Sequence, residues 1–106
     1  LRNDIEILNI EDIESEYYLR IPARDRVGVM AKISQVLTNY GINIEAVIQK
    51  EPHGPDAEKG IVPMVILTSR ILEKTMNVAI AVIESLDEVA GDVTRIRVEL
   101  FDDERV

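Results

Sequence analysis

The 106-residue chain contains no cysteine and only one histidine. The absence of cysteine excludes disulfide bonds, thiolate metal ligands and a cysteine nucleophile, and it fits a reducing cytoplasm. The histidine, His53, lies between Pro52 and Gly54. Since no second imidazole is present to form a zinc site or a carboxylate-oriented dyad with it, we expect His53 to be a solvated loop residue.

The chain also lacks long apolar runs and an excess of positive charge. Its longest apolar runs, residues 61–67 and 78–83, have seven residues or fewer. A membrane-spanning helix needs about 20, so no transmembrane segment is predicted. Twelve Lys and Arg residues against 20 Asp and Glu residues give a net charge of -8. This is the wrong sign for binding phosphates, so neither nucleic acid nor an anionic membrane is expected as a partner.

What the chain does have is enough apolar surface for one folded domain. Hydrophobic residues make up 46% of the sequence and charged residues 30%, which allows burial to offset the entropy lost on folding. The length is that of a single domain. The chain begins at Leu1 with an acidic stretch and without a basic, apolar leader. We therefore expect one domain that is a piece of a longer protein.

The spacing of apolar residues predicts six elements. Apolar residues at every second position predict strands, and spacings of three and four predict helices. Gly41 is expected to end the first helix in the left-handed conformation. Pro63 cannot donate to a strand ladder, so we expect it at a strand start or a bulge. The elements, in order, are a strand from Tyr17 to Ala23, a helix over 27–40, a strand over 42–49, a strand over 61–68, a helix that Thr68 or Ser69 caps and that ends near Asp87, and a strand with Ile96, Val98 and Leu100 on its buried face.

This order of elements predicts a ferredoxin-like α+β fold. With right-handed crossovers, β-α-β-β-α-β gives a four-stranded antiparallel sheet with both helices on one face. The second strand then lies at an edge, where an identical strand could pair with it by two-fold symmetry. Lys50 and Glu45 could instead protect that edge.

The second face of the predicted sheet needs a cover. Either residues 1–16 or another subunit or domain packs on it. We expect this face to carry Tyr18, Val47 and one set from Pro63, Val65 and Leu67.

No catalytic constellation is recognisable. The sequence has no nucleophile with a base, no paired carboxylates in a cleft, no metal cluster and no P-loop at a known spacing. The acidic residues at 12–16 and 102–104 are expected to be solvated.

The turn before the first helix is the part of the chain that suits a small ligand. A helix start has free N–H groups that can hold a carboxylate, and Gly28 would let a ligand approach the backbone. Asp25 could accept from an ammonium group, while Asn43 and Gln49 on the neighbouring strand offer amides. Together these groups suit a zwitterion. Each also has a purely structural interpretation as a cap, a packing glycine, a turn residue or a solvated edge side chain.

Three segments closely resemble an ACT domain: YYLR at 17–20, DRVGVMAKI at 25–33 and GINIEAVIQK at 41–50. More narrowly, VIQKE at 47–51, VPMVILT at 62–68 and VAG at 89–91 are similar to the C-terminal ACT domain of bacterial homoserine dehydrogenases. The resemblance covers residues 17–100. Val27 stands where many family members have proline, a change that a helix start tolerates.

The resemblance implies a regulatory module that pairs side by side and binds an amino acid at the interface. In homoserine dehydrogenases it implies feedback control of the aspartate-family pathway by L-threonine, with the NAD(P)-dependent reaction in a catalytic domain absent here. The fragment itself should then hold no cofactor and no metal and should not be catalytic. By position, the resemblance assigns ligand binding to Asp25, Val27, Gly28, Val29, Met30, Asn43, Ile44 and Gln49.

Residues 1–16 contain no strong helix or turn signal, so we expect a linker with one possible short strand there, followed by the ACT domain over 17–101 and a tail over 102–106. The resemblance implies a homodimer formed through the edge of the second strand and the first helix. The alternative is a structural dimerisation module that has kept the fold but has no occupied ligand site.

Overall fold

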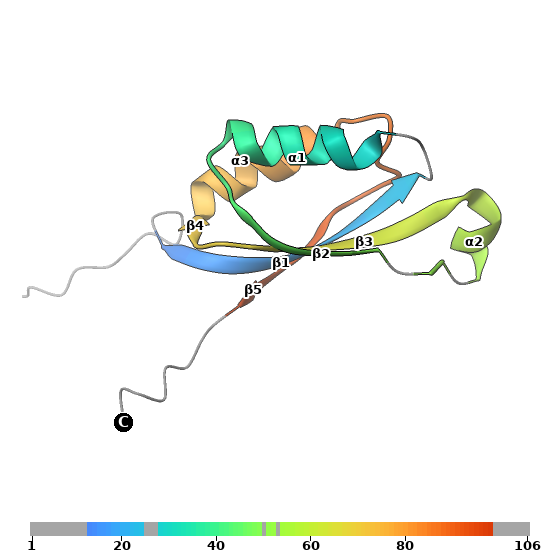
Figure 1. Cartoon of the computed structure of the whole chain (residues 1–106), viewed down its shortest axis with the longest axis horizontal. Coiled ribbons are helices and arrows are strands. Elements are labelled where there is room, and N and C mark those ends of the chain that lie inside the picture. The colour runs from blue at the N-terminus through green and yellow to red at the C-terminus, as the bar shows by residue number, and fades with distance from the viewer. Residues whose placement is uncertain (1–12, 25–27, 50, 53, 99–106) are drawn as a thin grey trace, which may run out of the picture.

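The computed structural model describes residues 13–24, 28–49, 51–52 and 54–98. Figure 1 shows α1 and α3 together on one face of the sheet. In chain order the elements are β1 (Glu14–Arg24), α1 (Val29–Asn39), β2 (Ile44–Gln49), α2 (Pro55–Lys59), β3 (Ile61–Thr68), β4 (Ile71–Leu72), α3 (Glu73–Glu84) and β5 (Thr94–Val98).

The sheet is antiparallel and is built around β1. Strand β3 pairs with one side of β1 and β5 with the other, and the short β4 pairs with the first two residues of β1. Strand β2 pairs with β3 and lies at the edge. The predicted α+β, ferredoxin-like architecture is therefore confirmed, including the edge position of the second strand.

The core lies between the sheet and the two long helices. The alternation predicted for the first strand is confirmed, because Tyr17, Leu19, Ile21 and Ala23 are all buried. Helix α1 contributes the buried face that its three-and-four spacing predicts. The other buried core residues are Val29, Ile33, Val36, Leu37, Ile42, Met64, Ile66, Met76, Ala79, Ile80, Ile83 and Val89. None of the helices in the described ranges is long and apolar enough to cross a membrane.

The second long helix begins later than predicted. Thr68 belongs to β3, and its hydroxyl accepts a hydrogen bond from the backbone N–H of Tyr17 at 3.2 Å. Residues 71 and 72 then form β4 against the start of β1, so α3 starts at Glu73 with Leu72 as its N-cap residue. Neither Thr68 nor Ser69 is the cap, because pairing of the intervening residues with β1 takes precedence over local capping.

Two further elements differ from the prediction. Strand β1 starts at Glu14, three residues before Tyr17, because its first residues pair with β4. The predicted loop over 51–60 contains the one-turn helix α2, which has Pro55 in its first turn and ends at Gly60 with φ of 73°. Proline suits a first turn because its N–H is not needed there, and glycine adopts the left-handed cap at low cost.

The last strand faces the opposite way from the prediction. Arg95 pairs with Leu19 and Arg97 with Tyr17, whose side chains face the helices. Cross-strand partners share a face, so the two arginines lie on the helix side and Ile96 is 54% exposed on the other. The predicted alternation is correct, but the predicted buried face is wrong. On the helix side, Arg95 and Arg97 of β5 form ion pairs with the Glu73 carboxylate of α3. Leu100 lies outside the described residues.

A bulge changes the faces of β2. Ile44 pairs with Thr68, but Ala46 pairs with Leu67, and the register shifts between them. One extra residue reverses which side chains face the core. Val47 consequently lies opposite the core residue Ile66, on the helix side, and its predicted place on the second sheet face is wrong.

Pro63 lies near the start of β3, as predicted, and pairs with Pro22 of β1. The Pro22 carbonyl accepts a hydrogen bond from Ala90 N–H at 2.7 Å, on the side away from β3. The two prolines therefore form a non-hydrogen-bonded pair. The nitrogen of Pro63 points toward the β2 side of β3. The pairing of β2 with β3 ends at Met64, so the missing N–H of Pro63 removes no hydrogen bond between these strands.

Candidate functional site

The start of α1 presents exposed backbone, as the ligand prediction requires. Gly28 is the N-cap residue, has φ of 88° and makes no side-chain cap. Its carbonyl accepts from Lys32 N–H at 3.1 Å, the first intrahelical bond. Among the described residues, apart from its chain neighbours and the backbone of α1, no atom lies within 4 Å of the position that a Cβ would take at Gly28. Space is therefore open here, but only glycine adopts this backbone conformation without strain.

The predicted residues around Gly28 have different environments. Val29 is buried in the core, so only its backbone is available to a ligand, and Met30 is partly buried against the same core. The first N–H groups of a helix have no intrahelical acceptor, so those that follow Gly28 remain available to an anion. Asp25 and Val27 lie outside the described residues.

A loop after α3 clamps this end of the molecule. Lys32 Nζ lies 2.6 Å from Glu88 Oε2, and Arg24 N–H donates to the Glu88 carbonyl at 2.8 Å. Arg24 Nε also donates to the Asp87 carbonyl at 3.0 Å. Lys32 is exposed on its helix, and no local pattern in the sequence pairs it with a residue 56 positions later. These contacts hold the end of β1 and the first turn of α1 against one loop.

The predicted residues of β2 lie at both of its ends. The Asn43 carbonyl accepts from Ser69 N–H at 2.9 Å, and its exposed side chain lies beside the start of the strand. Ile44 pairs with Thr68 and packs partly against the core. Gln49 pairs with Met64 at the other end and is exposed.

One copy of the chain does not bring all of these residues together. Met64 also pairs with Ile21 of β1, near the strand end that leads to Gly28, whereas Thr68 lies at the opposite end. Gln49 thus lies at the Gly28 end of the sheet and Asn43 at the far end. Helix α1, with 11 residues, runs between the two ends and is about 16 Å long at 1.5 Å per residue.

The free edge of β2 carries exposed apolar side chains. Val47 is 42% exposed and Ile48 is 49% exposed. Edge strands that keep apolar residues and unpaired backbone groups are suited to pairing with another strand. In a two-fold antiparallel pairing of β2 with its copy, Asn43 of one chain would approach the Gly28 end of the other.

The described residues contain no group of three or more histidine, aspartate or glutamate side chains placed to hold a metal ion. The backbone N–H groups that follow Gly28 offer hydrogen bonds, which suit recognition of a small polar molecule.

Comparison with known proteins gives a consistent result. Residues 17–77 match the family model of the ACT domain. The chain is 50% identical over 97 residues to the homoserine dehydrogenase of Pseudomonas aeruginosa, a match that covers 92% of this chain and 22% of the enzyme.

Solved structures agree with these matches. The crystal structure of a homoserine dehydrogenase from Thiobacillus denitrificans superposes with a TM-score of 0.78 at 45% identity, over 91% of this chain and 20% of that one. The ACT domain from the GTP pyrophosphokinase of Chlorobium tepidum superposes with a TM-score of 0.60 at 17% identity, over 79% of this chain and 100% of that one. The first structure is similar to this chain in both sequence and fold, whereas the second, at 17% identity, supports the fold alone. The chain spans about a fifth of the length of the dehydrogenases that it matches.

Proposed function

The chain belongs to the ACT domain family, and we propose that it is the amino-acid-binding regulatory part of a longer homoserine dehydrogenase. The similarity to two such enzymes over more than nine-tenths of this chain supports the proposal. NAD(P)-dependent oxidation and reduction would take place in the remaining four-fifths of the enzyme, so this part would bind a regulator without catalysing the reaction.

We propose L-threonine as the regulator and a two-copy site as its place of binding. The observation that carries this proposal is the separation of Gly28 from Asn43 at opposite ends of α1 in one copy. Pairing of two β2 edges would unite the Gly28 turn of one copy with Asn43 and Ile44 of the other, while Gln49 approaches from the same end as Gly28. Backbone N–H groups would hold the carboxylate and side-chain amides would position the remaining polar groups.

Regulation would follow from binding to one arrangement of the dimer. A ligand shifts a conformational equilibrium only by the difference between its affinities for the two states. Threonine that contacts both copies would favour the paired arrangement, and the linker toward the catalytic domain would transmit that preference.

Ligand-dependent melting of the 106-residue chain tests this function. A ligand at 100 times its dissociation constant adds about 2.7 kcal/mol of stability. We expect a selective rise in melting temperature with L-threonine among the 20 amino acids, and a smaller rise for Asn43→Ala. Gln35→Ala, on the exposed side of α1, is the matched control and should respond like the parent chain.

The second candidate function is a structural dimerisation module. The exposed Val47 and Ile48 on the free edge of β2 favour it, because they would support pairing without any ligand. A dimer seen by sedimentation, together with no amino acid that raises the melting temperature, would favour this function over sensing.

A further inference from the structure

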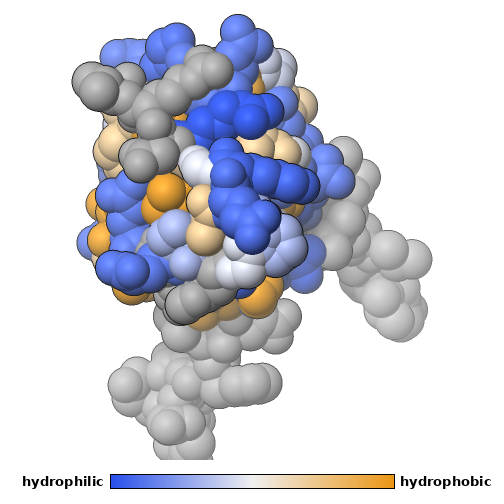
Figure 2. All heavy atoms as spheres, turned by 90° about the vertical axis from the view of Figure 1, so that its right-hand side faces the viewer, coloured by the Kyte–Doolittle hydropathy of each residue, from blue (hydrophilic) through white to orange (hydrophobic). Residues whose placement is uncertain are grey.

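A hollow opens on the sheet face opposite α1 and α3. Its floor comes from β1 and β3, and its walls come from α2 and from the turn before β5. Figure 1 shows α2 in the connection between β2 and β3, directly before β3 and at one end of the sheet. Figure 2 views this end of the molecule and shows mostly hydrophilic side chains around scattered apolar ones.

The floor of the hollow is rigid and apolar. Pro22 and Pro63 are cross-strand partners, and their rings lie side by side on the same face. As a non-hydrogen-bonded pair they approach more closely than the flanking pairs do. Proline rings have no donor and little conformational freedom, so they provide a fixed surface for an apolar group.

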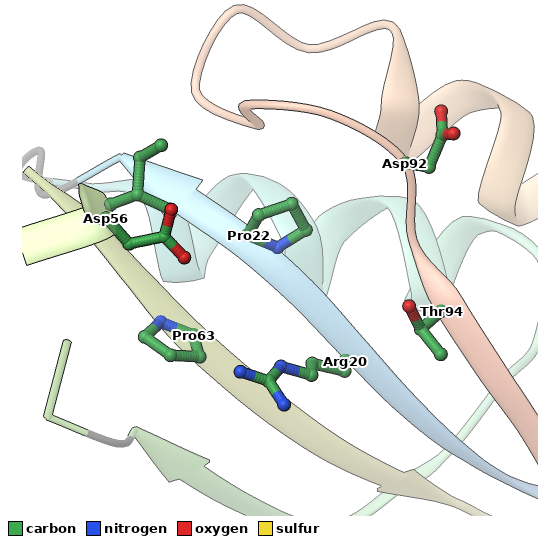
Figure 3. A pocket seen from close by; sticks show the side chains of 7 residues that line it. Arg20, Pro22, Asp56, Pro63, Asp92 and Thr94 are labelled. Atoms are coloured by element: carbon green, nitrogen blue, oxygen red, sulfur yellow. The ribbon is translucent and has the colours of Figure 1, made fainter. Parts of the chain in front are cut away.

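Charged groups of both signs surround this floor. Arg20 comes from β1, Asp56 from α2 and Asp92 from the turn before β5. Figure 3 shows the Arg20 guanidinium and the Asp56 carboxylate at different sides of the two proline rings, with the Thr94 hydroxyl beyond Pro22. Within the ranges that the structure describes, no ion pair joins Arg20 to Asp56 or to Asp92. The charges therefore border the hollow without neutralising one another.

This arrangement has the dimensions and the polarity of a site for a small molecule. The cavity measures about 160 Å³, and an engineered cavity of about 150 Å³ holds a benzene molecule. Ligand sites combine an apolar lining with a few placed polar groups. A guanidinium pairs with a carboxylate, often through two hydrogen bonds, and an aspartate pairs with an ammonium group.

We propose that this hollow, bounded by Arg20, Asp56, Asp92 and Thr94 over the Pro22–Pro63 floor, is a second binding site that takes a neutral or basic α-amino acid. Arg20 holds the ligand carboxylate, Asp56 holds its ammonium group, and the ligand side chain lies on the proline rings. Asp92 adds a second negative charge, which selects against acidic amino acids by repulsion.

The second site is independent of the proposed threonine site. It lies on the sheet face opposite α1 and α3, whereas Gly28 begins α1. An amino acid bound here would contact one copy of the chain only, so occupancy does not require a dimer.

Chemical-shift titration of the ¹⁵N-labelled chain tests the second site. The probes are L-valine and L-threonine, together with isovalerate and isobutylamine, which are valine without its amine and without its carboxylate. We expect both amino acids to shift the amide signals of Arg20, Asp56, Asp92 and Thr94, and each single-charge analogue to bind at least tenfold more weakly. Arg20→Gln and Asp56→Asn should each weaken binding of L-valine at least tenfold.

Two exposed residues outside the hollow supply matched controls. Glu58→Gln changes a charge on the same short helix, and Arg70→Gln removes an arginine from the turn between β3 and β4. Both variants should bind L-valine like the parent chain. Arg20 and Asp56 are exposed and belong to different elements, so a folding defect in one variant leaves the other as a test.

The contrary outcomes separate this proposal from the proposed function. Shifts confined to residues 28–30 and 43–49 would support the threonine site and overturn the second site. Isovalerate or isobutylamine binding as tightly as L-valine would overturn recognition of a zwitterion. The absence of any shift with either amino acid would overturn the second site as well as threonine sensing.

Discussion

The hydroxyl of Tyr17 donates a hydrogen bond to the Glu73 carboxylate, which joins the central strand to the first turn of α3. Arg95 Nη1 lies 3.3 Å from Glu73 Oε2, and Arg97 Nη2 lies 3.5 Å from Glu73 Oε1. Tyr17 and Glu73 are both buried. A carboxylate in a first helical turn also interacts favourably with the helix dipole. One side chain thus links β1, β5 and α3.

Glu73→Gln should destabilise the fold by about 2 kcal/mol. The substitution keeps the shape but leaves two arginines without their countercharge, and breaking a buried pair on one side is costly. We set the value below that of a fully buried pair because both arginines are about one-third exposed. Urea unfolding measures the change, with the exposed Glu51→Gln as control. Equal midpoints for the two variants would contradict the role of Glu73.

Stability should fall at alkaline pH through Tyr17. Burial and then the hydrogen bond to Glu73 raise the pKa of Tyr17 above its ordinary value of 10.0. A raised pKa in the folded state means that the unfolded chain loses this proton first. The contribution is therefore fully present below about pH 10 and is lost as the pH rises through the folded-state pKa. Urea unfolding from pH 8 to 11 should show a weaker decline for Tyr17→Phe than for Tyr40→Phe.

Gly28→Ala should lower stability by about 1 kcal/mol and weaken the response to L-threonine. A side chain at φ of 88° is strained although the space around it is open, because the left-handed region costs about 1–2 kcal/mol for most residues. Gly28→Asn should recover part of the stability, since asparagine tolerates this region better. Thermal melting with and without threonine measures both effects. An unchanged threonine response in both variants would argue against the role of this turn.

Lys32 and Glu88 should prove energetically coupled. Their 2.6 Å contact has a buried carboxylate and a lysine that is 58% exposed, so we expect a coupling energy of about 1 kcal/mol or less. A double-mutant cycle with Lys32→Met and Glu88→Gln measures it. Glu88→Gln should cost more than Lys32→Met, since Glu88 is the buried partner. Strict additivity of the two variants would mean that the contact does not clamp the loop.

Val47→Lys should shift the chain from dimer to monomer. In the proposed β2 pairing, two-fold symmetry would bring a lysine of each copy near the other, and like charges across paired strands are unfavourable. Val47 is already 42% exposed, so the stability of the monomer should change by less than about 0.5 kcal/mol. Sedimentation velocity measures the mass. Val78→Lys, at a 49% exposed position of α3, is the control and should remain dimeric.

Local periodicity was sufficient for most of the fold. The alternation around Leu19 and the helical spacing around Ile33 each predict which face of the element is buried. A few neighbouring residues are enough for that prediction. The same holds for Gly28, whose neighbours resemble a family motif and whose backbone conformation requires glycine. The order of these elements then restricts the topology, because crossovers of one hand leave few arrangements.

The sequence by itself thus determined the architecture, the edge position of β2 and the glycine turn that precedes α1. Only the tertiary structure decided which face of β5 is buried, because that depends on the carboxylate of Glu73, more than 20 residues earlier in the chain. It also decided the bulge in β2, the pairing of Lys32 with Glu88 and the meeting of Arg20, Asp56 and Asp92 over two prolines. Such contacts join residues that are far apart in the chain, so no local sequence pattern predicts them.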